Sequence, residues 1–314
     1  MTAPSTAAEI RAVNERYHDV AAADYDSKWG IDFGPTGRRQ VLAKVGKALG
    51  DRAREPFGRA LEIGAGTGYF SLNLVRAGVV REATCSDISP GMLATLRDNA
   101  RRLALDVRTV HAAADALPFE DSSFDLVLGH AVLHHLPDLP TAMGEFHRVL
   151  APGGTVVFAG EPSRYGDRLA ALPKRGAHAL APAWRRLVGA RRAHWQDNGD
   201  PVPDDGHGLE RWVDVHAFAP GELASRASEA VFTDVRVRGE ELAASCFGWS
   251  NRALEATAEP DDVPWLWRQY AYRGYLLLQQ VDRRLLERRL PSALFYNLLL
   301  SGRRAWALAR RPPA

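Results

Sequence analysis

Cysteine is scarce in this chain, and long apolar runs are missing. Only Cys85 and Cys246 occur among the 314 residues, which is too few for a disulfide framework, and their spacing forms no metal motif. No apolar run reaches the length that spans a bilayer. Residues 1–23 lack the apolar core of a signal peptide and carry three acidic side chains. We therefore expect a cytoplasmic globular protein.

Lysine is also rare, since it occurs only at positions 28, 44, 47 and 174, and the other basic residues are arginines. The formal net charge is only +2, which gives no global reason to expect a nucleic-acid partner. The length exceeds that of a usual single domain, and the hydrophobic fraction of 46% is ordinary for a globular protein. One enlarged domain, or a domain with an appendage, is expected.

The chain is organised around a glycine-rich stretch at residues 60–70. Before the glycines, Ala60, Leu61 and Ile63 form a short apolar run that suits a buried parallel strand. After them, apolar residues between 69 and 75 follow helical spacing. Glycine tolerates positive φ and lets a ligand touch the backbone, and a helix start offers unpaired N–H groups. The stretch therefore predicts a ligand-binding turn between a strand and a helix.

The spacing of the glycines, Gly64-x-Gly66-x-Gly68, narrows the choice of ligand. A dinucleotide site requires G-x-G-x-x-G, but Tyr69 stands in place of its last glycine. No Lys-Ser or Lys-Thr follows, which excludes a Walker A loop. Glu62 lies two residues before the first glycine, where an acid repels pyrophosphate but suits an amino group. S-adenosylmethionine (SAM), which has an amino group and no phosphate, is such a ligand.

The end of the second predicted strand, residues 83–88, fits the same ligand. Asp87 follows the glycine turn by about twenty residues, where a carboxylate reaches two ribose hydroxyls; the alternative is a solvated acid. Ile88 is placed to pack on the adenine. Ser89 and Pro90 are the preferred residues at a helix start, and Met92, one turn into that helix, points back at the pocket.

A third strand is predicted near residues 107–113, and Asp115 follows it. The carboxylate of Asp115 can accept a hydrogen bond from the adenine amino group, and the backbone N–H of Ala116 can donate to a ring nitrogen.

Residues 61 to about 160 resemble a class I SAM-dependent methyltransferase. Within that class they are most similar to the small-molecule branch that includes the ubiquinone and menaquinone methyltransferases. The resemblance rests on the glycine motif and on three further patterns: Asp115-x-x-Pro118-Phe119, Ser123-Phe124-Asp125 and Arg148-Val149-Leu150-x-Pro152-Gly153-Gly154. It implies an α/β fold with a Rossmann-like, doubly wound, seven-stranded and mostly parallel sheet.

The sequence also predicts an organisation along the chain, in which residues 161–215 and 251–314 depart from the minimal family. Residues 1–37 are expected to form a helical N-terminal lid, and 38–250 the SAM-binding core with an insert at 161–215. Residues 251–314 form a helical C-terminal appendage. Strands four to seven are predicted at 124–130, 155–159, 231–237 and 242–247. In the lid, Tyr25 and Trp29 either line the cofactor site or only anchor the first helix, predicted at 7–22.

Ligands of doubly wound sheets bind at the carboxyl ends of the strands, where the strand order reverses. By similarity, that point lies between the first and fourth strands, which places His130 beside the sulfonium. The residues expected to bind the cofactor are therefore Tyr25, Glu62, Gly64, Ala65, Gly66, Gly68, Asp87, Ile88, Met92, Asp115, Ala116 and His130.

Methyl transfer needs close approach and exclusion of water, and an oxygen acceptor also gains from a general base. His134 and His135 follow strand four at the active edge, and Glu161 ends strand five. Each is a candidate base; alternatively, the histidines only shape the pocket. His130 and His134 have the spacing of a metal pair, but no H-E-x-x-H motif and no nearby third ligand exist, so no metal is expected.

The function expected by similarity is SAM-dependent methylation of a small acceptor, with O-methylation favoured over C or N. The aromatic residues of the insert and of the C-terminal segment favour an apolar or lipid-like acceptor. An alternative is a non-catalytic SAM-binding module that associates with a membrane or partner through basic C-terminal helices. From Arg268 onward, arginines outnumber acids among many aromatics and leucines. Such a stretch can lie on an anionic membrane. Packing on its own domain or in a homodimer is more common, and we favour it for residues 251–314.

Overall fold

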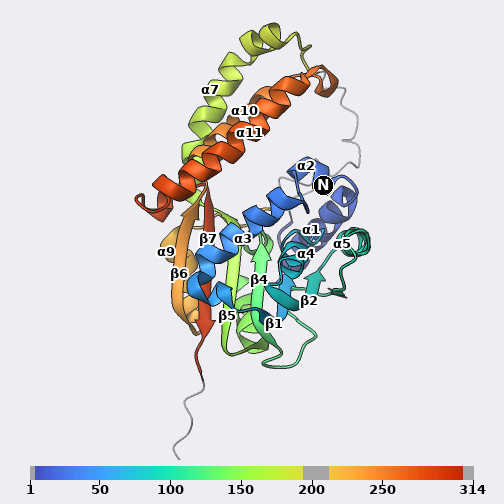
Figure 1. Ribbon diagram of the computed structural model, residues 1–314, viewed down its shortest axis with the longest axis vertical. Helices are drawn as coiled ribbons and strands as arrows, with labels where there is room; N and C mark the ends of the chain where they lie inside the picture. Colours follow the sequence, from blue (N-terminus) through green and yellow to red (C-terminus); the bar gives the residue numbers. More distant parts are fainter. Residues whose placement is uncertain (1–3, 194–211, 307–314) are drawn as a thin grey trace, which may run out of the picture.

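The computed structural model describes residues 4–193 and 212–306 (Figure 1). A seven-stranded sheet with the order β3-β2-β1-β4-β5-β7-β6 forms its centre. Only β7 runs antiparallel to its neighbours. This arrangement confirms the predicted Rossmann-like fold. The strands are β1 (Phe57–Ile63), β2 (Val80–Asp87), β3 (Arg108–His111), β4 (Phe124–His130), β5 (Leu150–Pro162), β6 (Phe232–Glu240) and β7 (Asn297–Arg304).

Helices cover both faces of the sheet, and the strands are therefore apolar on both sides. The α-helices are α1 (Ala7–Ala21), α2 (Tyr25–Trp29), α3 (Pro35–Leu49), α4 (Tyr69–Arg76), α5 (Pro90–Arg102), α6 (Leu139–Val149), α7 (Arg164–Val188), α9 (Pro220–Glu229), α10 (Ala243–Glu255) and α11 (Trp265–Val281). Short helical turns are η1 (Gly50–Arg54), η2 (Leu133–His135), η3 (Pro260–Asp262), η4 (Asp282–Leu286) and η5 (Ser292–Leu294).

Two clusters of buried side chains hold these layers together. Alternate residues of β4 divide between them, since Val127 packs with Phe146 of α6 on one face, whereas Leu126 and Leu128 pack on the other. The second cluster contains Phe70 of α4 and residues of α3. The strand order reverses between β1 and β4, as the doubly wound topology requires.

The predicted position of strand seven, residues 242–247, is wrong. These residues lie at the start of α10, and the last strand is β7, within the segment predicted as an appendage. The reason is burial: Leu298, Leu299 and Leu300 are almost fully buried between β5 and β6. The residues at 242–247 include two alanines, which favour a helix.

A layer of three helices projects beyond the sheet at the upper end of Figure 1. α10 packs against both α7 and α11. α7 begins directly after β5 and occupies the first part of the predicted insert at 161–215; residues 194–211 of that insert lie outside the described part of the chain. Among the described helices, none is long and apolar enough to cross a membrane.

Candidate active site

The glycine turn after β1 has the backbone that its sequence predicts. Gly64, Gly66 and Gly68 have positive φ values of 59°, 52° and 92°. A Cβ atom on Gly64 would lie 2.4 Å from Cγ2 of Val132, so no side chain fits there. A Cβ atom on Gly66 would meet no heavy atom within 4 Å. The backbone at Gly66 is therefore open to a ligand.

Asp87 at the end of β2 is bound to this turn. Its carboxylate accepts hydrogen bonds from the N–H groups of Gly66 (2.8 Å) and Ser89 (2.9 Å). Burial raises the pKa of Asp87, although His18 and the two N–H donors act in the opposite direction. Ser89 caps α5 by accepting from the N–H of Met92, and Pro90 follows at the first helical position, as predicted.

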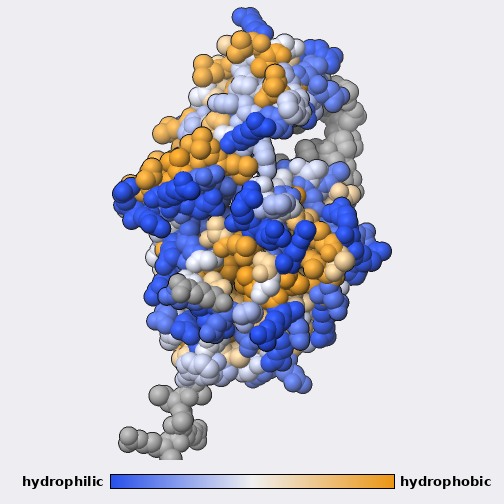
Figure 2. Space-filling view, viewed as in Figure 1, coloured by the Kyte–Doolittle hydropathy of each residue, from blue (hydrophilic) through white to orange (hydrophobic). Residues whose placement is uncertain are grey.

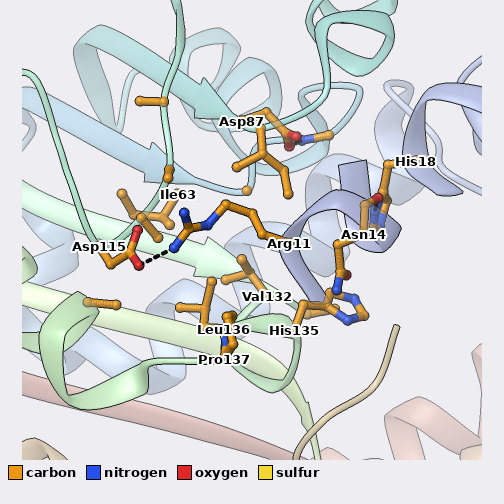
Figure 3. Close-up of a pocket in the computed structure, with 18 of the residues that line it drawn as sticks. Arg11, Asn14, His18, Ile63, Asp87, Asp115, Val132, His135, Leu136 and Pro137 are labelled. Carbon is orange, nitrogen blue, oxygen red and sulfur yellow. Dashed lines mark hydrogen bonds and ion pairs between the residues drawn. The ribbon is translucent and has the colours of Figure 1, made fainter. Parts of the chain in front are cut away.

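One pocket joins these groups at the carboxyl ends of β1, β2 and β4 (Figure 3). Its volume, including the open mouth, is about 800 Å³, which is within the range of small-molecule sites. The predicted residues that line it are Tyr25, Gly64, Gly66, Asp87, Ile88, Asp115, His130 and His135. The predicted residues outside the lining are Glu62, Ala65, Gly68, Met92, Ala116, His134 and Glu161.

Several of the residues outside the lining support its wall. The carboxylate of Glu62 accepts from the N–H of Ser71 (2.9 Å), and burial raises the pKa of Glu62 to about 8. The N–H of Ala65 bonds to the carbonyl of Ser86 (3.0 Å), and that of Ala116 to the carbonyl of Ala113 (3.2 Å). Met92 is completely buried.

Helix α1 contributes residues to the pocket that sequence analysis did not identify. Arg11, Asn14 and His18 line it, and Arg11 pairs with Asp115 at 2.6 Å (Figure 3). Their spacing of three and four residues places them on one face of the helix. This polar face is the sequence feature from which they could have been identified. α1 is held in place partly by Asp19, which accepts from the hydroxyl of Ser89 and the N–H of Gly91.

His130 lies at the end of β4 with its ring stacked on Phe70, at a centroid distance of 4.7 Å. Burial lowers the pKa of His130 to about 4, so the ring is neutral near pH 7. Gly160 lies close by, since a Cβ atom there would be 2.8 Å from Nε2 of His130. The residue therefore presents an uncharged ring to the pocket.

Glu161 is completely buried and binds the turn that follows β4. One carboxylate oxygen accepts from the N–H groups of Val132 and Leu133, both at 3.0 Å. The other accepts from the N–H of His134 (3.2 Å) and from its Nδ1 (2.8 Å). Burial would raise the pKa of Glu161, but the bonds and charge of His134 and the backbone N–H groups lower it overall. The carboxylate therefore holds η2 in position.

His135, beside His134, lines the pocket. Its Nδ1 lies 3.1 Å from the carbonyl oxygen of Val213; because a carbonyl only accepts, Nδ1 carries the proton and Nε2 is the basic nitrogen. Burial, His134 and His18 lower the pKa of His135 well below its ordinary value. His135 is therefore a neutral imidazole, which is the form that can accept a proton.

The end of the insert reaches the same turn. A carboxylate oxygen of Asp214 lies 3.3 Å from Nδ1 of His135 and 3.6 Å from Nε2 of His134. The N–H groups of Val215 and His216 donate to the carbonyl of His134. One ligand atom from each of His134, His135 and Asp214 lies within 4.8 Å of the others. The fold thus brings a third potential metal ligand to a histidine pair, although sequence analysis found none nearby.

Comparison with known proteins identifies the central part of the chain. Residues 61–158 match the family described as a methyltransferase domain. These residues form a methyltransferase domain. The match contains the glycine turn, Asp87, Asp115 and both candidate histidines. It confirms the predicted family and SAM as the cofactor of this domain.

Two relatives show how far the similarity extends. The malonyl-[acyl-carrier protein] O-methyltransferase of Halorhodospira halophila is 34% identical over 184 residues, which cover 59% of this chain and 51% of that protein. The demethylmenaquinone methyltransferase of Thermus thermophilus is 40% identical over 99 residues, which cover 32% of this chain and 45% of that protein. The chain thus spans about half the length of these curated relatives.

Solved structures share the fold of the methyltransferase domain. The phosphoethanolamine N-methyltransferase 2 of Haemonchus contortus with SAM gives a TM-score of 0.57 at 17% identity, covering 94% of this chain and 60% of that one. The [4+2]-cyclase SpnF gives 0.56 at 18% identity, covering 98% and 99%. At these identities the likeness concerns the fold alone.

Proposed function

We propose that this protein transfers the methyl group of SAM to a small, apolar or lipid-like acceptor, and that the acceptor atom is oxygen. One observation carries the proposal: the open backbone at Gly66 and the Asp87 carboxylate bound to it lie in the same pocket as the neutral imidazole of His135. A cofactor site and a proton acceptor therefore face one cavity.

The side chains that line the pocket fit the parts of SAM. Asp87 would hold the ribose hydroxyls, since each of its oxygens uses only one of its acceptor positions on the backbone. Ile88 would pack on the adenine. Asp115, which also lines the pocket, would accept from the adenine amino group with the acceptor positions that Arg11 leaves unused. When bound, SAM supplies an electrophilic methyl group. The chain itself has to bind SAM and the acceptor, orient them and exclude water from the methyl group.

His135 is our proposed base for the acceptor hydroxyl. Its Nδ1–H is fixed by the carbonyl of Val213, so Nε2 is left to take the proton. We assign Glu161 and His134 to positioning, because Glu161 is fully buried and uses its carboxylate to bind the turn that carries His135. The alternative, that the histidines only shape the pocket, makes a different prediction for turnover.

The names of the relatives support a methyl acceptor of this kind. One group of similar proteins acts on oxygen by name, as malonyl-[acyl-carrier protein] O-methyltransferases, and another is named for demethylmenaquinone. The pocket lining includes the apolar side chains of Val132, Leu136 and Ala142. This lining suits an apolar acceptor better than a charged one.

The test is transfer of a labelled methyl group. The purified chain is incubated with methyl-labelled SAM and a panel that contains malonyl thioesters, quinols and long-chain phenols, with Asp87→Ala as the cofactor-site control. Labelled product from the wild-type chain, but not from Asp87→Ala, supports the proposal. SAM binding without transfer to any acceptor would favour the non-catalytic SAM-binding module.

A further inference from the structure

Exposed apolar side chains are concentrated in the helical layer that projects beyond the sheet. Of the fifteen large hydrophobic residues exposed in the described part of the chain, eleven lie in α7, α11 and η4, which have 25, 17 and 5 residues. Figure 2 shows apolar surface over these helices. The eleven residues are Tyr165, Leu169, Leu172, Leu180, Leu187, Trp265, Leu266, Tyr270, Tyr272, Leu277 and Leu285.

The exposed apolar residues of α7 form one stripe. Tyr165, Leu169, Leu172, Leu180 and Leu187 follow one another by four, three, eight and seven residues, which places them on one side of a helix. Leu180 and Leu187 are 66% and 83% exposed. We call these five residues the α7 stripe. An apolar stripe in solvent is unfavourable, so a partner surface is expected.

The α7 stripe is separate from the side of the helix that packs on the protein. The buried residues of α7 lie on a different side of the helix from the stripe, and α10 packs against α7. α7 is therefore apolar on two sides, of which only one is used within the described chain. Its buried residues are Gly166, Ala170, Ala177, Ala181 and Trp184.

Arginines lie along the α7 stripe. Arg168, Arg175 and Arg186 are exposed and occupy the helical positions next to it, whereas Arg164 pairs with Glu222 of α9. Across residues 164–193 and 243–290, fifteen lysines and arginines stand against seven acids, a net charge of +8, whereas the rest of the chain has −6. Long arginine side chains can bury their stems beside apolar groups while the charge reaches phosphate.

We propose that the layer of α7, α10 and α11 lies on an anionic lipid membrane, with the α7 stripe at headgroup depth and its arginines at the lipid phosphates. A helix with an apolar face and flanking basic residues has this binding mode. A second copy of the chain fits less well, because two layers of net charge +8 would repel each other.

Membrane binding would also explain the position of the layer. α7 starts where β5 ends, and the pocket lies at the carboxyl ends of the neighbouring strands. The layer and the pocket therefore share one end of the molecule, where a lipid-like acceptor would be close. The membrane contact does not rest on the proposed methyl transfer, since it needs neither SAM nor turnover.

The experiment is vesicle flotation of the full chain with phosphatidylcholine vesicles, with and without phosphatidylglycerol, at low and high salt. We expect binding to the anionic vesicles only, weakened by salt. The double variant Leu180→Glu/Leu187→Glu should abolish it, and Arg175→Gln and Arg186→Gln should each weaken it about fivefold. Circular dichroism and SAM titration check that the variants remain folded.

Two matched controls lie outside the layer. Val231→Glu places the same charge at another exposed apolar residue, and Arg81→Gln removes an exposed arginine at the start of β2; both should bind like the wild type. The proposal is overturned if the wild-type chain does not float with anionic vesicles, or if it floats equally with neutral vesicles. A dimer in sedimentation analysis that Leu180→Glu/Leu187→Glu dissociates would assign the face to a second copy instead.

Discussion

The four hydrogen bonds of Glu161 make a prediction that separates a positioning role from a catalytic one. The carboxylate is fully buried and accepts from three consecutive backbone N–H groups, those of residues 132–134, and from Nδ1 of His134. Glu161→Ala leaves all four donors without their acceptor and opens a cavity. Glu161→Gln keeps the shape but replaces one acceptor oxygen with an NH2 group.

The expected losses of stability differ between these variants. Each buried donor left without an acceptor costs about 1–3 kcal/mol, and Glu161→Ala leaves four of them, so we expect a loss of at least about 3 kcal/mol. In Glu161→Gln, the amide oxygen can serve Val132 and Leu133, and the His134 ring can change tautomer to accept from the amide. Only the backbone N–H of His134 then stays unpaired, at a cost of about 1–3 kcal/mol.

Urea unfolding at pH 7 measures both values, from the shift in midpoint at an unchanged slope. Glu229→Ala is the control, since its side chain is 62% exposed; we expect it to change stability by less than about 0.5 kcal/mol. If Glu161→Ala unfolds within about 0.5 kcal/mol of the wild type, the positioning argument is refuted. If Glu161→Gln remains as stable as the wild type but loses turnover, Glu161 is the base.

Three further predictions concern the same site. Because burial raises the pKa of Glu62 to about 8, the folded chain holds a proton that the unfolded chain releases above pH 4.5. The free energy of unfolding should therefore fall as the pH rises from about 5 to 8. Urea titrations at several pH values measure this slope, and Glu62→Gln should flatten it. His135→Gln should lower turnover about a hundredfold while the SAM dissociation constant changes less than about twofold, as expected for a general base; equal turnover in both proteins would leave His135 a pocket-shaping role. Dialysis against EDTA should leave turnover unchanged, because we expect no metal; loss of activity that zinc or manganese restores would instead make His134, His135 and Asp214 a metal site.

The parts of the site that lie within one strand and its following turn could be predicted from sequence. Gly64, Gly66 and Asp87 have local reasons for their identity: a positive φ, an open backbone and a strand end. The Ser89–Pro90 helix start is equally local. The fold class was predicted from the family resemblance that these motifs carry, and the alternation of apolar strands with helices favours the same parallel sheet.

The contacts that join distant segments could not be predicted. Arg11 meets Asp115 across 104 residues, and Asp214 reaches His135 from the far end of the insert. Nothing in the local pattern of α1 or of the insert says which turn each will cover. The last strand was misplaced for a related reason: its burial depends on a gap between β5 and β6, which the neighbouring residues in sequence do not reveal.

The central claim is that SAM binds at the glycine turn, and calorimetric titration with SAM tests it most directly. Gly66→Ala and Gly78→Ala form a matched pair: both positions have positive φ, 52° and 71°, and in both a Cβ atom would contact nothing within 4 Å. Each substitution therefore carries a similar backbone strain of about 1–2 kcal/mol, but only Gly66 lines the pocket. We predict micromolar binding by the wild type and Gly78→Ala, and at least about tenfold weaker binding by Gly66→Ala, whose methyl group would occupy ligand space. Equal binding by all three proteins, or none by the wild type, would contradict the account.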